Sequence, residues 1–325
     1  MAYALYTPAN VAAAIDNLAG FYSGTMGWTV TNDPGNGDCL IELPGKTAKF
    51  RLGVDDYSYY SSNYGGMSYE LLLIDMENVA SPFRCAANWI SPITRMYVFA
   101  GTTPEPWSLI TFETAPNYFA HAYFGYLEKL GTYNGGAICD ASFWGLSTGS
   151  YDRKWDYYQA HLLFGGLNEV SATDRIGGVQ IDDPGAPYGT YRFSRRTDRH
   201  RVGGGFGDAY TFLLSAVEHS GIDGGITFQP ITLSADLTDD GWHTPVGNVP
   251  GVRAVNLAPF QVGEVITVGG EDWQVFPLVT RSVAYGERNP DPAAHPGNLQ
   301  PDSGGNYDYN MGLSTENYGL AVLRG

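Results

Sequence analysis

Histidine is the residue type most often used for metal binding and for acid–base catalysis, and the 325-residue sequence contains six histidines. They are His121, His161, His200, His219, His243 and His295. No two of them have the HxH or HExxH spacing that places two imidazoles on one metal ion. The sequence therefore predicts no histidine metal centre.

Two loops have compositions that can bind ions or phosphates. The stretch DLTDDGWH places Asp236, Asp239 and Asp240 near His243, but it lacks the alternating oxygen ligands and the final glutamate of a calcium loop. The stretch GGGFGD is not followed by the Gly-Lys-Ser/Thr sequence of a phosphate-binding loop. We interpret the first as a solvated turn and the second as a flexible turn.

Catalytic motifs are also missing from the sequence. It has no GxSxG elbow, and no serine or cysteine stands in a familiar arrangement with a histidine and an acid. Paired acids such as Asp182 and Asp183 could in principle serve a glycosidase, but every acidic protein offers such pairs. We expect a protein that is not an enzyme and needs no cofactor.

A cluster of arginines is unusual in a chain with a formal net charge of -16. Guanidinium groups can hold carboxylates or phosphates in bidentate geometry. We expect the cluster to pair with acids of a neighbouring subunit, with a solvated loop as the first alternative and a nucleic-acid contact as the last. Its members are Arg192, Arg195, Arg196, Arg199 and Arg201.

The overall composition limits the partners and the compartment. The negative charge disfavours binding to nucleic acid or to an anionic membrane. Cys39, Cys85 and Cys139 lie far apart in sequence and are odd in number, which predicts reduced and mostly buried thiols. The first residues have no basic segment, and no stretch of eighteen apolar residues occurs. We expect synthesis in a cytosol.

The elements that would position these residues are mostly strands. Residues 8–20 predict a short helix, because Val11, Ala14, Ile15 and Leu18 recur at helical spacing. Strands are predicted in CLIELPG, AKFRLGV and YELLLIDM. A hairpin is predicted in which TTPEP forms the turn between the strands TRMYVFAG and WSLITFET. The second half predicts a hairpin at Gly269 and Gly270 and a final strand in ENYGLAVLR. The stretch DAYTFLLSAVEH fits a helix or a buried strand.

These patterns predict a mainly β protein with sandwich or barrel-like domains, a short N-terminal helix and long loops. Residues 1–150 are expected to form the helix and a first β domain, and residues 151–205 a loop-rich insertion or junction. Residues 206–325 are expected to form a second β region, which can also pack into the same sheet system.

Three stretches carry a resemblance to a known class of proteins. They are FGYLEKLGTYNGGAI at residues 124–138 with the preceding strand at 107–125, the segment from TPVGNVPGVR to DWQVFPL at 244–278, and the N-terminal order of a helix, a linker and GWTV. Together they resemble structural proteins of tailed bacteriophages. The resemblance covers about half of the chain, and it carries no active-site residues.

The resemblance implies a virion component, expected in the tail or baseplate region, that assembles with copies of itself and with other virion proteins. Aromatic side chains supply much contact area in such assemblies. The residues expected to divide between a core and a subunit interface are Tyr123, Phe124, Tyr126, Tyr133, Phe143 and Trp144, with Arg195, Arg196, Arg199 and Arg201 setting the register. The alternative for these rings is a wholly intramolecular core. The alternative functions are a capsid decoration or head–tail connector protein, a tail-tip module that binds a host-surface glycan, and a glycan-cleaving enzyme.

Overall fold

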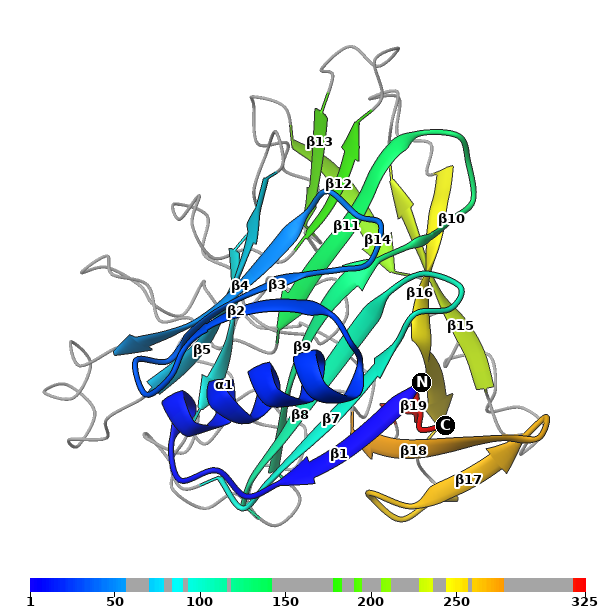
Figure 1. Cartoon of the computed structure of the whole chain (residues 1–325). Helices are drawn as coiled ribbons and strands as arrows, with labels where there is room; N and C mark the ends of the chain where they lie inside the picture. The colour runs from blue at the N-terminus through cyan, green and yellow to red at the C-terminus, as the bar shows by residue number, and fades with distance from the viewer. Residues whose placement is uncertain are drawn as a thin grey trace, which may run out of the picture.

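The computed structural model describes twelve segments of the chain. They are residues 1–56, 70–78, 84–89, 93–115, 118–141, 178–182, 190–194, 206–211, 228–235, 244–256, 259–277 and 318–325. The protein is mainly β in these segments, as the sequence predicts, with one short α-helix (Figure 1). The described strands form two hydrogen-bonded systems, one of five strands and one of 14, and neither closes into a barrel.

The N-terminal helix α1 (Val11–Gly20) begins where the sequence predicts. The side chain of Asn10 accepts a hydrogen bond from the backbone N–H of Ala13 at 2.8 Å, which satisfies one of the free donors of the first turn. The apolar positions Val11, Ala14, Ile15 and Leu18 are all fully buried. The helix runs on into a π-helical turn, η1 (Phe21–Thr25), before the chain turns into the first sheet.

The five-stranded system is an antiparallel meander, here called the helix-side sheet. Its order follows the sequence: β2 (Thr29–Asp33), β3 (Asp38–Glu42), β4 (Lys49–Asp56), β5 (Glu70–Glu77) and β6 (Arg84–Trp89). Three of these strands contain the predicted runs CLIELPG, AKFRLGV and YELLLIDM. Alternate residues such as Ile41, Phe50 and Leu52 are fully buried, which is the pattern of a sheet with one covered face.

The first half of the 14-stranded system is here called the central sheet. It contains β1 (Ala2–Tyr6), β7 (Arg95–Gly101), β8 (Trp107–Ala115), β9 (Tyr118–Tyr126), β11 (Asn134–Ala141), β12 (Gly178–Asp182) and β13 (Thr190–Ser194), in this order and all antiparallel. The pairing of β7 with β8 confirms the predicted hairpin. The strand β1 at one end of the order was not predicted.

The second half, here called the C-terminal sheet, joins the first through a parallel pairing of β13 with β14. Its order is β14 (Phe206–Thr211), β15 (Phe228–Ala235), β16 (Thr244–Asn256), β19 (Tyr318–Leu323), β18 (Glu271–Pro277) and β17 (Val265–Val268). The strand β10 (Glu128–Lys129) pairs with β16 and so ties the β9–β11 connection to this sheet. The predicted glycine-turn hairpin and the predicted last strand are both confirmed.

Two expectations for the middle of the chain can be compared with the structure. The stretch that fits either a helix or a strand begins as the strand β14, and its residues after Thr211 lie outside the described segments. The predicted loop-rich region 151–205 contains the strands β12 and β13, which extend the central sheet. Regular structure is therefore present where no periodicity predicted it.

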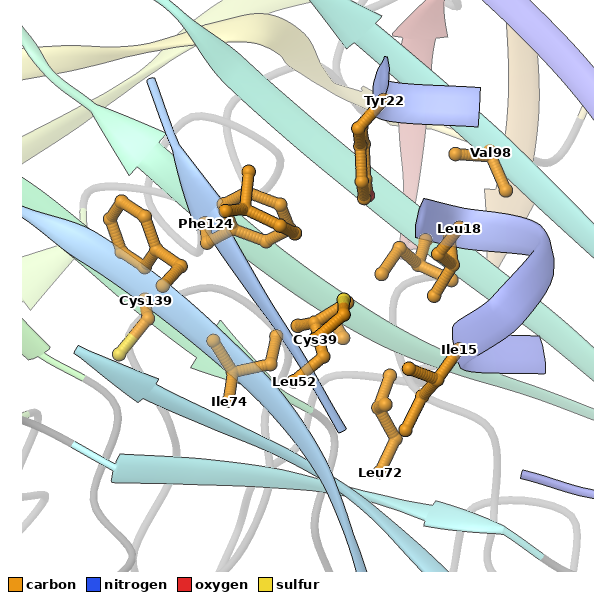
Figure 2. Close-up of a cluster of buried hydrophobic side chains, with 14 of the residues drawn as sticks. Ile15, Leu18, Tyr22, Cys39, Leu52, Leu72, Ile74, Val98, Phe124 and Cys139 are labelled. Atoms are coloured by element: carbon orange, nitrogen blue, oxygen red, sulfur yellow. The ribbon is translucent and has the colours of Figure 1, made fainter. Parts of the chain in front are cut away.

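The central sheet lies between two hydrophobic cores. Along β8, Ile110 belongs to the core shared with α1 and the helix-side sheet, whereas its neighbour Leu109 belongs to the core shared with the C-terminal sheet. We call these the helix-side core and the C-terminal core. Figure 2 shows the helix-side core, in which Leu18, Leu52 and Phe124 come from α1, β4 and β9. The described part of the chain is thus a three-layer structure with a sheet in the middle that is buried on both faces.

Candidate assembly surface

Tyr123 and Phe124 lie on β9 in the middle layer, and both are fully buried. The ring of Tyr123 stacks on Trp107 with centroids 6.5 Å apart, and its hydroxyl donates to the carbonyl of Pro250 at 3.1 Å. Phe124 points the other way and packs on Phe50 with centroids 5.0 Å apart. The expectation that these two rings reach a subunit interface is therefore wrong, because each is enclosed by a core of its own chain.

The next two predicted rings are held by hydrogen bonds to other strands and loops of the same chain. Tyr126 is 7% exposed, and its hydroxyl accepts from the backbone N–H of Ala48 at 2.9 Å. Tyr133 is partly buried against the C-terminal core, and its hydroxyl donates to the carbonyl of Val246 at 2.7 Å. For Tyr126 the interface expectation is also wrong, and Tyr133 serves mainly to fasten the β10–β11 connection to β16.

The remaining predicted interface residues cannot be placed. Phe143, Trp144, Arg195, Arg196, Arg199 and Arg201 all lie outside the described residues. Their role in subunit contacts stays a prediction from the sequence.

A buried polar group that the sequence analysis missed lies between the central and the C-terminal sheet. His121 on β9 is fully buried, and its Nε2 donates to the carbonyl of Pro277 at 2.7 Å. Its Nδ1 therefore accepts from the hydroxyl of Thr111 at 2.9 Å. Burial lowers the pKa of His121 to about 4, so the imidazole is neutral at pH 7. Successive side chains of β9 point to opposite faces of the sheet, so His121 lies on the same face as Tyr123. This alternation is the sequence signal that could have identified His121 as a buried residue.

This polar group joins two layers and is fully buried in the described structure. Asp140 on the neighbouring strand β11 is also fully buried. Among the described residues no group of three or more His, Cys, Asp or Glu side chains could hold a metal ion. The chemistry available at His121 is a hydrogen bond between two sheets.

The three cysteines are free and buried, as the sequence predicts. Cys85 on β6 and Cys139 on β11 make a side-chain hydrogen bond with each other across the helix-side core. Burial is the main cause that raises the pKa of Cys85, followed by the hydrogen bond to Cys139. Burial likewise raises the pKa of Cys39 to about 12. These thiols are packing groups.

Exposed apolar side chains gather at the β17–β18 hairpin. Of the large hydrophobic residues that are exposed in the described segments, three lie on β17 or just before it: Val262, Val265 and Val268, each 37–38% exposed. Figure 1 shows this hairpin at the edge of the fold, beyond β19. Gly269 and Gly270 form its turn with φ of 65° and 88°, the backbone that a tight two-residue turn needs.

The ionisable side chains of this hairpin are all acidic, although Arg324 follows the neighbouring strand β19 and its backbone N–H donates to the Asp272 carbonyl at 2.8 Å. Glu264 and Glu271 are exposed and Asp272 is partly exposed, whereas no lysine or arginine occurs in the sequence between Arg253 and Arg281. The guanidinium of Arg253 lies over the ring of Trp273 at 5.3 Å and is half-buried there. An apolar strand flanked by carboxylates thus lies at this end of the described sheet.

The other end of the 14-stranded order is more fully covered. Leu5 on β1 is 49% exposed, but Tyr3 on the same strand lies under the guanidinium of Arg324 at 4.3 Å. Arg95, at the far end of the neighbouring strand, is 3.8 Å from the carboxylate of Glu113. The arginines next to β1 are therefore engaged within the chain, and the hairpin edge at β17 is the better candidate for an assembly surface.

The sequence predicts this hairpin but not that its edge is a candidate surface. A usable signal was present: VITV contains neither a charge nor a proline, which are the residues that usually protect an exposed sheet edge. Among the described segments, no helix is long and apolar enough to cross a membrane. No protein-family model and no curated protein sequence matches this chain.

Proposed function

We propose that this chain is a non-enzymatic structural subunit of a tailed-bacteriophage virion, located in the tail or baseplate region. It works by assembly with copies of itself and with other virion proteins. The observation that carries the proposal is the edge strand β17, which is last in the order of the described strands and on which Val265 and Val268 are exposed between acidic residues. Exposed apolar strand edges are sites where another chain can add.

The stretches that resemble phage structural proteins support the same proposal. Residues 124–138 include the end of β9, all of β10 and the first part of β11, and the hydrogen bond from Leu130 N–H to the Val246 carbonyl at 3.0 Å joins this stretch to β16. Residues 244–278 contain β16, β17 and β18. The resembling stretches therefore meet in space, and the second of them contains the candidate surface.

The basis of the proposal changes with the structure. The rings of β9 fill two cores of the same chain, so the aromatic content of residues 121–126 is explained without a second subunit. The feature that remains to join subunits is the short edge of β17, which is flanked by negatively charged carboxylates. This geometry suits a subunit that is stable alone and binds its neighbours through local contacts.

The test is the composition of the particle. Phage particles produced by the strain that encodes the chain are purified on a density gradient and analysed by quantitative mass spectrometry. We expect the chain at a fixed copy number, and electron cryomicroscopy should locate it in the tail or baseplate. Location in the head or neck would transfer the function to a decoration or connector protein. Absence from infectious particles would overturn the proposal.

A further inference from the structure

The backbone at the edge of β17 has hydrogen-bonding groups directed away from the hairpin. Val275 N–H donates to the carbonyl of Glu264 at 2.9 Å, and Gly263 N–H donates to the carbonyl of Val275 at 2.7 Å. In an antiparallel pair, alternate residues bond to the partner strand. The register therefore directs residues 264, 266 and 268 toward β18. The N–H and C=O groups of Val265 and Thr267 point to the other side, where no strand of the described segments lies.

Side chains along β17 divide between the two faces of the hairpin. Ile266 lies opposite Trp273 and packs against the C-terminal core. Val265 and Thr267 lie on the other face, where the Thr267 hydroxyl donates to the carboxylate of Asp272 at 2.7 Å. An added strand would meet two sets of backbone groups and an exposed valine, with no lysine or proline in between.

Charge decides what kind of strand fits this edge. A second copy of the same hairpin fits this edge less well, because antiparallel self-pairing about Ile266 would place Glu264 of one copy about 10 Å from Glu271 of the other and would supply no cation from the hairpin to either. A segment that carries lysine or arginine would instead place cations beside Glu264, Glu271 and Asp272.

We infer that the open edge of β17 binds an extended segment of another protein, with apolar and basic residues in alternation, as an added strand. The inference rests on the proposed function only in placing that protein in the same particle. Backbone bonds to Val265 and Thr267 would supply the register, and the flanking carboxylates would supply the preference for a basic segment.

The experiment uses a synthetic probe with the full chain. The probe is a fluorescently labelled peptide, acetyl-Lys-Val-Arg-Val-Lys-Val-Lys-amide, and the matched control peptide has glutamate at each basic position. Binding is measured by fluorescence anisotropy at low ionic strength. We expect the basic peptide to bind at least tenfold more tightly than the acidic peptide. Hydrogen exchange at residues 262–268 should slow in its presence.

Two sets of variants show whether the edge itself is used. Thr267→Pro removes an outward N–H without touching the ladder to β18, and we expect it to weaken binding at least tenfold. Thr267→Ala is the matched control, since it loses the same bond to Asp272 but keeps the N–H. The double variant Glu264→Lys, Glu271→Lys should reverse the peptide preference, so that it binds the acidic peptide more tightly than the basic peptide.

Three outcomes would overturn the inference. The first is equal affinity of the chain for the basic and the acidic peptide. The second is equal affinity of the Thr267→Pro and Thr267→Ala variants for the basic peptide. The third is self-association of the free chain that Thr267→Pro abolishes, because the occupant of the edge would then be a second copy. Peptide binding and particle composition are separate measurements. A chain found in particles without strand addition would refute this inference alone, and strand addition by a chain absent from particles would refute only the virion proposal.

Discussion

The indole ring of Trp107 on β8 occupies the space that a side chain at residue 251 on β16 would need. A Cβ atom at Gly251 would lie 2.0 Å from Cζ2 of Trp107, and the backbone there has a φ of 72°. Trp107 is fully buried in the C-terminal core and stacks on Tyr123. Close approach of the central and C-terminal sheets at this point therefore requires glycine.

Replacing this glycine should loosen the contact between the two sheets. For Gly251→Ala we expect a loss of about 3 kcal/mol in the free energy of unfolding, from the left-handed backbone and the overpacking of Trp107 together. The matched control is Gly269→Ala, where φ is 65° but nothing lies within 4 Å of the added methyl group. That variant should lose only about 1 kcal/mol, from the backbone alone. Urea unfolding measures both, and equal losses would contradict the packing argument.

Tyr126 should contribute to the stability of the isolated chain. Tyr126→Phe keeps the ring, over which the ammonium of Lys46 lies at 4.8 Å, but removes the acceptor for the buried N–H of Ala48. An unsatisfied buried donor costs about 1–3 kcal/mol, and we expect a loss of that size in urea unfolding. The control is Leu130→Ala at a residue that is 50% exposed, with an expected change below about 0.5 kcal/mol. An unchanged stability for Tyr126→Phe would show that the bond between the Tyr126 hydroxyl and Ala48 does not stabilise the folded chain.

The elements that local pattern determines were predictable. The helix α1 has a capping asparagine and apolar residues at helical spacing, and the β17–β18 hairpin has two glycines where positive φ is required. In both cases the signal lies within a few residues of sequence. The hairpin prediction therefore also located the candidate surface, although its exposed edge follows only from the position of β17 at the end of the sheet order.

The error over the aromatic residues has a physical cause. In β9, Tyr123 and Phe124 are neighbours that point to opposite faces, so both can be buried only if the sheet is covered on both sides. Sequence alone does not reveal the number of layers. Rings on both faces of one strand fit a sheet that is covered on both sides by its own chain, and they fit equally well a sheet with one face in contact with another subunit. The third layer is built by β15–β19, which lie more than a hundred residues after β9. Such long-range packing leaves no local signal.

The three cysteines should be unreactive in the folded chain. Burial raises the pKa values of Cys39 and Cys85, so the reactive thiolate is scarce at pH 8, and all three sulfurs are enclosed. In the urea-unfolded chain, Ellman's reagent should react with all three thiols. In the same time we expect no reaction with the folded chain. The positive control is Val265→Cys at the exposed edge, which should react within minutes. Rapid titration of a native thiol would show that the helix-side core opens.

His121 should make the folded chain less stable in acid. Because burial lowers its pKa to about 4 from the ordinary value of 6.5, the unfolded chain binds a proton between these two pH values and the folded chain does not. The free energy of unfolding therefore falls as the pH drops from 6.5 to 4, by about 3 kcal/mol from this group, and its contribution is constant above pH 6.5. The hydrogen bonds to Thr111 and Pro277 keep the neutral imidazole in place.

The measurement is the difference in unfolding free energy between pH 7 and pH 4.5, compared with that of His121→Gln. Glutamine does not titrate, and its amide can still donate to the Pro277 carbonyl. The variant should lose about 2–3 kcal/mol less than the parent on acidification, even if it is less stable at pH 7. The carboxylates of the chain are the same in both proteins, so their titration cancels in the comparison. Parallel pH profiles would show that the imidazole is charged in the folded state or accessible to water.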